Sequence, residues 1–386
     1  MAKGIYIGDS SNKARKVKKL YIGDASGKAR KVKKVYIGDA NGKARLCWQS
    51  GLGKFVVTGG TNARAYSINS SNPTIHTLIP KPNDSLSQYY VHQASTFCLE
   101  NFVCVGSYGK VFFSKDGNTM YDNGTYQPEG GDSARFVKYL NGKIFTGAYS
   151  TGKLRYKNSI EDTTWTTISR TFKYIHDIAY GDGYYCIVYG ENNYNATGTL
   201  YYAYSTDLTS WTVKSFTTST MVNMGNICYF NGKFIMNFAY KGTYDWNGRT
   251  SRYISTSSMS GTPTSLPNSY ISMKIMDGKL YATGIYSSRS GAIGVSTDGV
   301  SWGVAHQFTD ANTQQEKDIR FTDVAYGDGV YTAIGFVVNS TYNYARCIAT
   351  SKDNMSTWSI AYYDDSALTS GNYLTSVSFS EDGGTQ

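Results

Sequence analysis

The sequence has few charged residues, no long apolar run and no cluster of metal-ligating side chains. Only 17% of its 386 residues are Asp, Glu, Lys or Arg. A membrane-spanning helix needs about 18 or more consecutive apolar residues, and no such run occurs. No apolar segment follows Lys3, so we expect no secretory signal. These absences argue against both a membrane protein and a secreted one.

The six cysteines are scattered and form no Cys-x-x-Cys pair. Five of them lie inside strand-like apolar runs, and none is grouped with the four histidines. This pattern predicts buried free thiols in a protein made in a reducing cytoplasm, and it argues against structural zinc or any other cofactor. The cysteines are Cys47, Cys98, Cys104, Cys186, Cys228 and Cys347.

Positive charge is confined to one end of the chain. The formal net charge is +10, and residues 1–46 account for all of it, with thirteen Lys or Arg against three Asp. Residues 47–386 hold 25 basic and 25 acidic side chains. A uniformly basic nucleic-acid-binding protein is therefore excluded for the bulk of the chain. Nucleic acid is disfavoured for the basic end too, because its strict, tyrosine-containing period is unlike a disordered basic arm.

That basic end is a repeat of 15 residues, in three copies at 5–19, 20–34 and 35–48. Each copy predicts a β-branched strand, a four-residue turn such as Asp24–Gly27, and a basic strand. Units this small cannot bury a core alone, so we expect them to trimerise or to dock on an acidic partner. The residues expected to mediate attachment are Tyr6, Tyr21, Tyr36, Arg15, Lys16, Arg30 and Lys31.

The rest of the chain predicts β-structure. It is rich in Tyr and Gly, 35 and 40 in the whole sequence, and pairs of turn residues stand between apolar strands. These pairs are Asn141-Gly142, Asp182-Gly183, Asn231-Gly232, Asp277-Gly278 and Asp328-Gly329, with Glu100-Asn101 as a degenerate sixth. Successive turns are 41 to 51 residues apart. This matches the four-stranded blades of a β-propeller, which repeat about every 40–50 residues.

The two ends of this region supply a seventh blade. Residues 375–384 look like a first strand and turn, and residues 51–60 look like a second strand. The C-terminal strand is therefore predicted to close the ring beside the strand near Phe55, which leaves no exposed sheet edge. We predict an all-β chain: a basic repeat module over residues 1–48 and a seven-bladed β-propeller over residues 49–386.

A second signature, Ser-x-Asp followed by Trp, stands between the third and fourth predicted strands of several blades. Copies begin at Ser205, Ser296 and Ser351, a fourth runs from Ser114 to Tyr121, and a degenerate fifth runs from Glu161 to Trp165. They resemble the Asp-box of sialidase-like propellers, in which the Asp caps a tight turn and the aromatic packs between sheets. The resemblance implies a structural role for Asp116, Asp207, Trp211, Asp298, Trp302, Asp353 and Trp358.

The long loops between second and third strands should share one face of the propeller. Four of them, at 190–198, 241–252, 286–291 and 337–346, carry aromatic, amide and guanidinium groups. Such groups suit a carbohydrate or a protein epitope, and the alternative is that these loops are merely solvated. The candidate ligand-binding residues are Tyr194, Tyr244, Trp246, Arg249, Arg252, Tyr286, Arg289, Tyr342, Tyr344 and Arg346. His92 and His176 are expected to line the ring axis rather than to bind metal.

A sialidase-like enzyme would need three arginines for a carboxylate, an acid/base Asp, and a Tyr activated by Glu. The Arg-Ile-Pro signature of that family is missing, and Arg64 is the only arginine between residue 49 and Ser114. Acidic residues are sparse in the loops, where Glu191, Asp245 and Glu316 are the visible ones. No catalytic residue is predicted, and a glycoside hydrolase is kept as an alternative.

The three basic repeats resemble an N-terminal module of structural proteins encoded by phages and prophages of Gram-positive bacteria. The remaining chain resembles the Asp-box propellers that terminate phage tail fibres. Together these resemblances imply a virion surface protein made in the bacterial cytoplasm. Its repeats would bind other virion proteins, and its propeller would bind host-surface glycan or protein, as in a tail fibre or receptor-binding protein. A structural capsid decoration or head-fibre protein is the other alternative. A homotrimer is favoured.

Overall fold

The computed structural model forms two compact units, Met1–Gly53 and Lys54–Gln386. The residues that it describes are 6–8, 14–16, 20–23, 29–32, 34–38, 44–49, 53–59, 64–80, 92–106, 109–122, 132–190, 197–221, 224–239, 250–266, 272–285, 291–308, 318–338, 344–363 and 374–380. Apart from one 3-10 turn, η4 (Thr256–Ser258), all elements of these residues are β-strands. No helix among them is long and apolar enough to cross a membrane.

The first unit contains three hairpins, each a separate two-stranded sheet. Their registers repeat, because Gly8 pairs with Ala14, Gly23 with Ala29 and Gly38 with Ala44. The 15-residue period of the sequence thus corresponds to one hairpin per repeat. The strands are β1 (Tyr6–Gly8), β2 (Ala14–Lys16), β3 (Leu20–Gly23), β4 (Ala29–Val32), β5 (Lys34–Gly38) and β6 (Ala44–Gln49).

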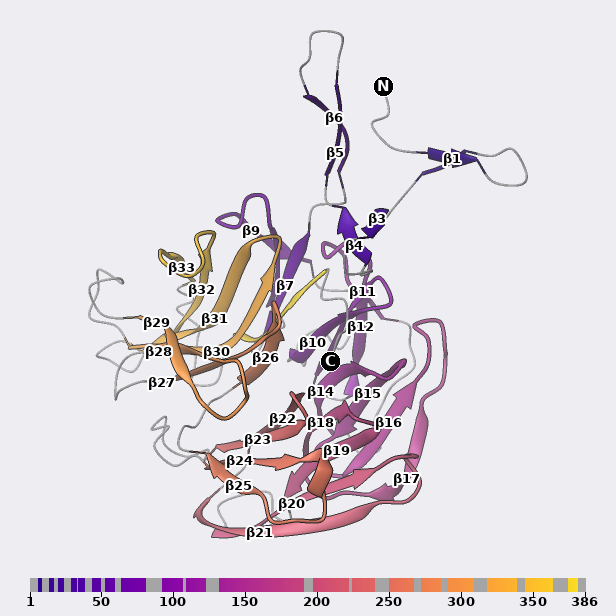
Figure 1. The fold of residues 1–386 in the computed structure, drawn as a ribbon, viewed down its shortest axis with the longest axis vertical. Coiled ribbons are helices and arrows are strands. Elements are labelled where there is room, and N and C mark those ends of the chain that lie inside the picture. Colours follow the sequence, from indigo (N-terminus) through magenta and orange to yellow (C-terminus); the bar gives the residue numbers. More distant parts are fainter. Residues whose placement is uncertain are drawn as a thin grey trace. The chain divides into compact units, whose positions relative to one another are not determined.

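The second unit contains seven antiparallel four-stranded blades (Figure 1). The first blade joins β34 (Leu374–Phe379) to β7 (Lys54–Gly59), β8 (Arg64–Asn69) and β9 (His76–Ile79). The second is β10 (His92–Cys98), β11 (Asn101–Gly106), β12 (Val111–Ser114) and β13 (Tyr121–Asp122). The third is β14 (Ala134–Leu140), β15 (Lys143–Ala148), β16 (Lys153–Lys157) and β17 (Thr166–Thr171).

The remaining four blades follow in chain order. The fourth is β18 (Ile175–Gly181), β19 (Tyr184–Gly190), β20 (Thr197–Ser205) and β21 (Thr212–Met221). The fifth is β22 (Met224–Phe230), β23 (Lys233–Ala239), β24 (Thr250–Ser255) and β25 (Thr264–Leu266). The sixth is β26 (Ser272–Met276), β27 (Lys279–Ile285), β28 (Gly291–Ser296) and β29 (Gly303–Gln307). The seventh is β30 (Asp318–Gly327), β31 (Val330–Val338), β32 (Tyr344–Ser351) and β33 (Ser359–Tyr363).

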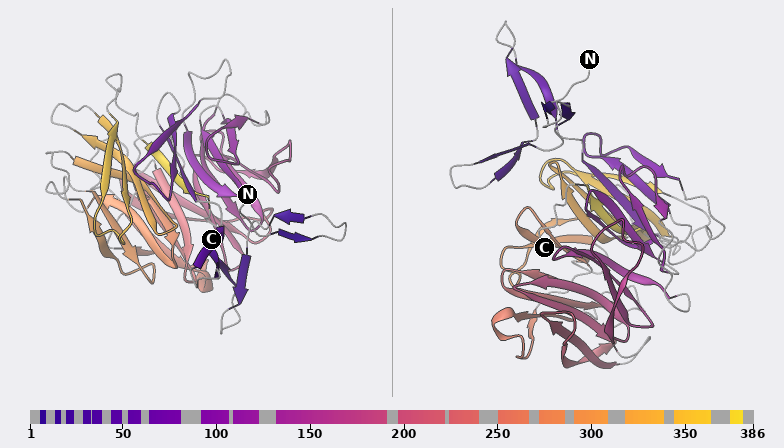
Figure 2. Two further views of the ribbon diagram at one scale, coloured as in Figure 1. Left: turned by 90° about the horizontal axis from the view of Figure 1, so that it is seen from above. Right: turned by 90° about the vertical axis from the view of Figure 1, so that its right-hand side faces the viewer.

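The blades form a closed ring, which Figure 2 shows from two further sides. The innermost strands β34, β10, β14, β18, β22, β26 and β30 contact one another in that circular order. The ring closes where the C-terminal strand pairs with β7, with Leu374 opposite Gly59 and Phe379 opposite Phe55. The predicted seven-bladed propeller, closed by its C-terminal strand beside Phe55, is confirmed.

The tight turns between first and second strands have the expected backbone. At Asn141-Gly142 both residues have positive φ, +46° and +75°, and the other four Asn-Gly or Asp-Gly pairs are alike. The predicted sixth turn is shifted by one residue. Leu99 and Glu100 form it, with φ of +47° and +62°, while Asn101 is already in β11 and pairs with Cys98. Neither Leu nor Glu favours positive φ, so the sequence contains no local signal for a turn at Leu99-Glu100, and the prediction was wrong by one residue.

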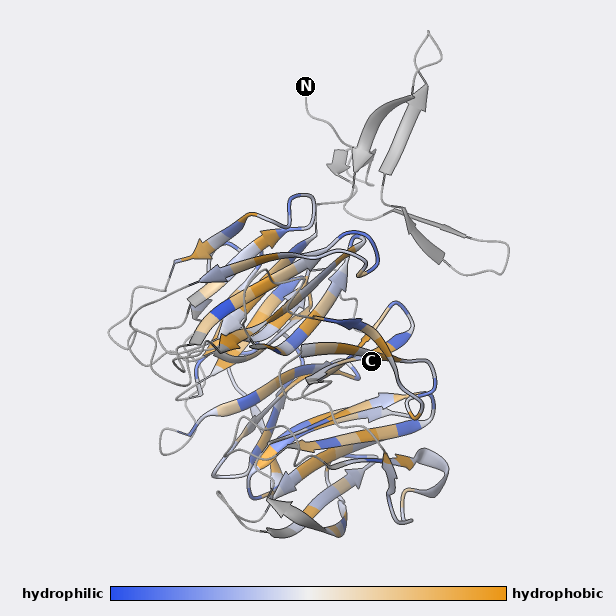
Figure 3. Cartoon of the chain, turned by 90° about the vertical axis from the view of Figure 1, so that its left-hand side faces the viewer, coloured by the Kyte–Doolittle hydropathy of each residue, from blue (hydrophilic) through white to orange (hydrophobic). Residues whose placement is uncertain are grey.

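The hydrophobic core lies between neighbouring blades. One cluster joins Phe145 and Phe172 of the third blade to Ile187 and Leu208 of the fourth, and the other clusters likewise span two sheets. Apolar and polar residues alternate along many strands (Figure 3), as expected for sheets that pack through selected faces. Cys98, Cys104, Cys186, Cys228 and Cys347 are free and buried in these layers, as the sequence predicts, and the side chain of Cys47 lies outside the described part.

Candidate functional site

Five of the seven innermost strands contain a β-bulge. Register shifts interrupt the ladder in β10, β14, β18, β30 and β34. In an up-and-down blade the first strand begins on the side of the second-to-third strand loops, which we call the loop face. Bulges re-aim side chains and are frequent beside functional sites. The loop-face ends of these strands are therefore where polar side chains gather.

One set of bulge residues joins the blades. Asp177 Oδ2 accepts hydrogen bonds from Lys138 Nζ at 2.7 Å and from the Ile227 amide at 2.9 Å, and Lys138 also donates to the Ile227 carbonyl at 2.9 Å. These residues lie on β14, β18 and β22, so one carboxylate links three blades. Burial raises the pKa of Asp177, opposed by Lys138 and the backbone amides.

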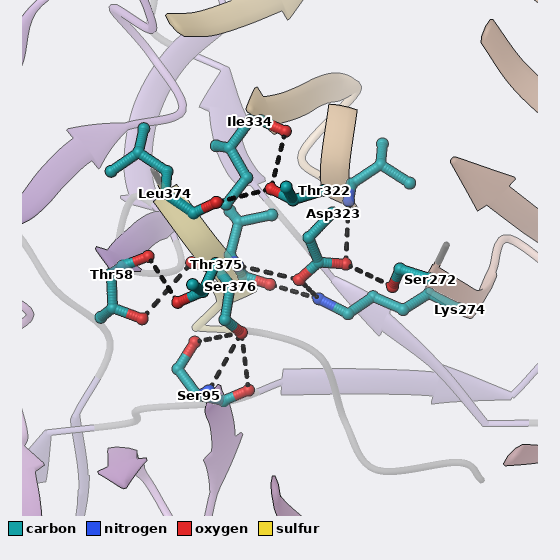
Figure 4. A network of polar contacts seen from close by, with 12 residues as sticks. Thr58, Ser95, Ser272, Lys274, Thr322, Asp323, Ile334, Leu374, Thr375 and Ser376 are labelled. Carbon is teal, nitrogen blue, oxygen red and sulfur yellow. Dashed lines mark hydrogen bonds and ion pairs between the residues drawn. The ribbon is translucent and has the colours of Figure 1, made fainter. Parts of the chain in front are cut away.

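Asp323 makes the same joint on blades six, seven and one (Figure 4). Its Oδ2 accepts Lys274 Nζ at 2.7 Å and the Val377 amide at 2.9 Å, and Lys274 donates to the Val377 carbonyl. Ser376 has the matching position on β34, where its hydroxyl accepts the Ser95 amide at 3.0 Å. Since these side chains hold neighbouring strands together, we assign them to the ring and not to chemistry.

A different group of side chains surrounds the bulges of blades three and four. We call it the bulge cluster, and it consists of Arg135, Tyr149, Tyr174, His176 and Gly190. The Arg135 guanidinium carbon lies 4.0 Å from the centre of the Tyr149 ring. Tyr149 packs edge-on against Tyr174, with centroids 5.4 Å apart, and lies 6.0 Å from the His176 ring. The cluster thus combines one cation, one imidazole and two phenol rings.

The electrostatics of the bulge cluster are unusual. His176 is 7% exposed, and burial, reinforced by the Arg135 charge, lowers its pKa to about 3. The imidazole is therefore neutral near pH 7, with one N–H donor and one acceptor. Among the described residues no carboxylate pairs with Arg135. The cluster carries a single positive charge beside two aromatic rings.

A rigid frame holds Tyr149 in place. Asp132 accepts the amides of Ser150 at 3.1 Å and Thr151 at 2.7 Å, and the Tyr149 amide donates to the Ser133 carbonyl at 3.0 Å. Burial opposes the ionisation of Asp132, but its hydrogen bonds outweigh burial and lower its pKa. The short connection after β15 is thereby fixed, and with it the ring on which Arg135 stacks.

The candidate residues from the long loops fare differently. Arg252 is half-buried on β24, where it donates to Ser265 Oγ at 2.9 Å and lies over the Phe216 ring at 4.9 Å. Arg346 is only 1% exposed on β32, in contrast to the surface position expected for it. The backbone of Tyr344 lies on β32, but its side chain is outside the described part. Tyr194, Tyr244, Trp246, Arg249, Tyr286, Arg289 and Tyr342 lie outside the described residues.

The Ser-x-Asp turns have a common hydrogen-bond pattern. Asp207 Oδ1 accepts the amides of Thr209 at 2.8 Å and Ser210 at 2.9 Å, while Ser205 Oγ accepts the Leu208 amide at 2.9 Å. Asp116, Asp298 and Asp353 accept amides in their own turns in the same manner. Trp211 packs edge-on against Phe172 of the preceding blade at 5.0 Å. These side chains support turns and blade contacts.

The attachment residues are placed on strands of the hairpins. Tyr6 lies opposite Lys16, Tyr21 opposite Lys31, and Tyr36 opposite Leu46. Arg15 is on β2 and Arg30 on β4. Within the described part of the chain, no group of three or more His, Cys, Asp or Glu residues could hold a metal ion.

The sequence pointed to His176 but missed Arg135, Tyr149 and Tyr174. A weak signal was present, since the alternation of the strand Ala134–Leu140 breaks at Phe136-Val137, where the bulge lies. A break in alternation does not say which side chain is redirected or what it meets. The meeting of Arg135 with Tyr149 depends on the β14–β15 bulge, and the meeting of Tyr149 with His176 depends on packing between two blades, so neither could be read from one segment alone.

No family model matches the sequence, and no curated protein matches it either. Solved structures are similar in fold. A candidate 6-phosphogluconolactonase from Bacteroides uniformis has a TM-score of 0.53 at 9% identity, over 85% of this chain and 99% of that chain. One from Bacteroides fragilis has the same score and identity, over 85% and 98%. YCF48 bound to D1 peptide has a TM-score of 0.49 at 15% identity, over 71% and 84%. The likenesses to the two Bacteroides proteins show a shared propeller fold and transfer no activity.

Proposed function

We propose that this protein is a non-catalytic surface protein of a phage virion, whose hairpin repeats attach it to the particle and whose propeller binds host-surface glycan. The observation that carries the binding part is the bulge cluster. The half-buried Tyr174 ring offers a surface on which a sugar ring can stack, while the buried Tyr149 ring supports Arg135 from below, and Arg135 and His176 offer donors for hydroxyl or acidic groups. A set of this kind at the loop-face ends of the innermost strands suits recognition of a polyhydroxylated ligand.

The carboxylates near these strand ends favour binding over hydrolysis. A retaining or inverting glycosidase generally uses two carboxyl groups that flank the scissile bond. Asp177 and Asp323 are the buried acids of the bulges, and each is already engaged by a lysine and by a backbone amide of the next blade. Moving either one toward a substrate would break a joint of the ring. Glycoside hydrolysis is therefore the weaker candidate.

The repeats suit attachment because of their backbone. Each is a two-stranded sheet by itself, and an isolated hairpin is only marginally stable in water. Unpaired strand edges are templates for pairing with another chain. Pairing with other virion proteins or with two further copies of this chain would stabilise all three repeats. A trimer would let weak glycan sites act together through avidity. A capsid decoration protein would use the same attachment, with a propeller that contacts virion proteins.

Binding of the labelled full-length chain to purified Gram-positive cell walls tests the glycan proposal. We expect retention that survives protease treatment of the walls and falls after periodate oxidation of their sugars. Retention that is lost with protease but not with periodate would overturn it in favour of a protein receptor. No retention on walls, together with firm retention on virions, would favour a structural decoration protein. Release of reducing sugar would establish a hydrolase.

Light scattering of the full-length protein tests the repeats separately. We expect an assembly three times the 42.6 kDa chain mass. Replacing the three repeat tyrosines by serine (Tyr6→Ser, Tyr21→Ser and Tyr36→Ser) should return it to one chain mass and release it from particles. A wild-type chain that is monomeric and is not retained by virions would contradict the proposed role of the repeats in attachment.

A further inference from the structure

Arg135 brings a positive charge to the loop face without a described counter-charge. The nearest acid along the chain is Asp132. Both of its carboxylate oxygens already accept hydrogen bonds, from the amides of Ser133, Ser150 and Thr151 and from the Ser150 hydroxyl. The guanidinium instead lies over the Tyr149 ring at 4.0 Å. At this distance the guanidinium makes a cation–π contact with the ring, and its buried Nε has no hydrogen-bond partner. Its N–H groups are thus left for a planar or tetrahedral anion.

His176 adds a second, uncharged group to the same place. It is more than nine-tenths buried, and no described residue hydrogen-bonds to either nitrogen of its ring. A Cβ built on Gly190 would lie 3.7 Å from His176 Nε2. Gly190 therefore leaves open the space in front of that nitrogen. An imidazole nitrogen with open space in front of it can hydrogen-bond to a ligand or to water.

We infer that the bulge cluster binds a singly charged anionic group of the host glycan, with Arg135 pairing with the anion and His176 hydrogen-bonding to the same ligand. The inference rests on the proposed function and names its ligand class. One formal cation matches one formal anion, because a neutral histidine adds a hydrogen bond but no charge. Two glycan groups have this single negative charge: the carboxylate of a uronic acid and the phosphodiester of a polyol phosphate.

The test uses the full-length protein and three soluble probes: a glucuronate oligosaccharide, glycerophosphoglycerol and a neutral glucose oligosaccharide. We expect titration calorimetry to detect binding of one or both anionic probes to the protein and no binding of the neutral probe. Equal affinity for the neutral probe, or binding to none of the three, would overturn the inference. The two anionic arms tell a carboxylate source from a phosphodiester source.

Three variants locate the site. Arg135→Gln removes the charge and should weaken the anionic probe about tenfold or more, since hydrogen bonds to charged groups contribute about 1.5–3 kcal/mol. Gly190→Ala adds a methyl at ordinary contact distance from His176, so the fold should tolerate it while the anion is obstructed. Arg170→Gln is the matched control, because Arg170 is exposed on the same blade and also lies over an aromatic ring, Phe172, at 5.8 Å. Unchanged affinity in both Arg135→Gln and Gly190→Ala would overturn the site.

Failure of this inference is distinguishable from failure of the proposed function. If walls retain the protein equally in wild type and Arg135→Gln, glycan binding stands and the anion site is overturned. If the anionic probes bind but walls do not, the anion site stands and host attachment is overturned. Binding to neither walls nor probes would overturn both.

Discussion

The ammonium group of Lys138 lies 2.7 Å from Oδ2 of Asp177, and the two residues belong to neighbouring blades. The same carboxylate accepts an amide from the blade after that, at Ile227. Lys274, Asp323 and Val377 repeat the arrangement elsewhere in the ring. Because each joint spans three innermost strands, the ring is cross-linked by charge where the bulges interrupt the backbone ladder.

Removing the lysine of such a joint should destabilise the ring. Breaking a buried ion pair leaves an uncompensated charge and costs about 3–5 kcal/mol. Since Lys138 is 21% exposed and Asp177 only 7%, we expect Lys138→Met to lower the free energy of unfolding by about 3 kcal/mol, at the lower end of that range. Urea unfolding followed by tyrosine fluorescence measures it.

A matched control for that variant is Lys143→Met on the same blade. Lys143 lies over the Tyr156 ring at 5.6 Å and makes no described ion pair, so its replacement should cost less than about 1 kcal/mol. Equal losses in the two lysine variants would show that the Lys138 joint contributes no more than a surface contact.

The close approach of the Phe379 ring should make Gly327 intolerant of any side chain. Gly327 ends β30, and a Cβ there would lie 2.0 Å from the ring of Phe379 on the strand that closes the propeller. Overpacking of a filled core lowers the free energy of unfolding by about 1–3 kcal/mol. Gly327→Ala should therefore lower the midpoint of thermal unfolding by roughly several degrees. Gly303→Ala is the control, because a Cβ at Gly303 meets nothing within 4 Å. Calorimetry that finds both variants alike would refute the clash.

The fold was predictable because its signals are local. The pairs Asn141-Gly142 and Asp328-Gly329 need positive φ at both positions, so each marks a hairpin without any knowledge of the ring. Ring closure between Phe379 and Phe55 followed from two incomplete units at the chain ends. The one misplaced turn, at Leu99-Glu100, is formed by residues that carry no such local preference.

The candidate site was less accessible to sequence reasoning. Arg135 lies on β14, Tyr149 in the connection that follows β15 of the same blade, and His176 on β18 of the next blade, so their meeting depends on bulge geometry and on packing between blades. Arg346 shows the opposite error. Its place beside a long loop suggests a surface ligand, but it lies on β32, between β31 and β33 in the seventh blade, and its side chain is 1% exposed. Residue type and loop position do not determine side-chain direction when a strand starts within the loop.

The turn aspartates should make the propeller sensitive to acid. Hydrogen bonds from Thr357 and Ser351 lower the pKa of Asp353 from 3.8 to about 2. A group whose folded pKa lies below its unfolded pKa contributes stability above the unfolded value, and that contribution is lost as the pH falls through the folded value. We expect Asp353→Asn to be less stable than wild type near pH 6, roughly, and to lose that disadvantage at about pH 2. Urea unfolding at both pH values checks this, and a difference that persists in acid would contradict the assignment.

The imidazole of His176 should remain neutral throughout the physiological range. Burial is the larger cause of its lowered pKa and the Arg135 charge the smaller, which together bring the value from 6.5 to about 3. Its folded pKa is therefore below its unfolded pKa, so the stability that it contributes is present above about pH 6.5 and is lost as the pH falls. Imidazole NMR of the full chain, with His176→Gln to assign the signal, should show no titration of this ring between about pH 5 and pH 8.

In the variant Arg135→Gln, the pKa of His176 should rise but stay below 6.5, because the ring remains buried. A ring that titrates near 6.5 in the wild type would mean that His176 becomes a second cation, and the match of the bulge cluster to a singly charged anion would fail with it.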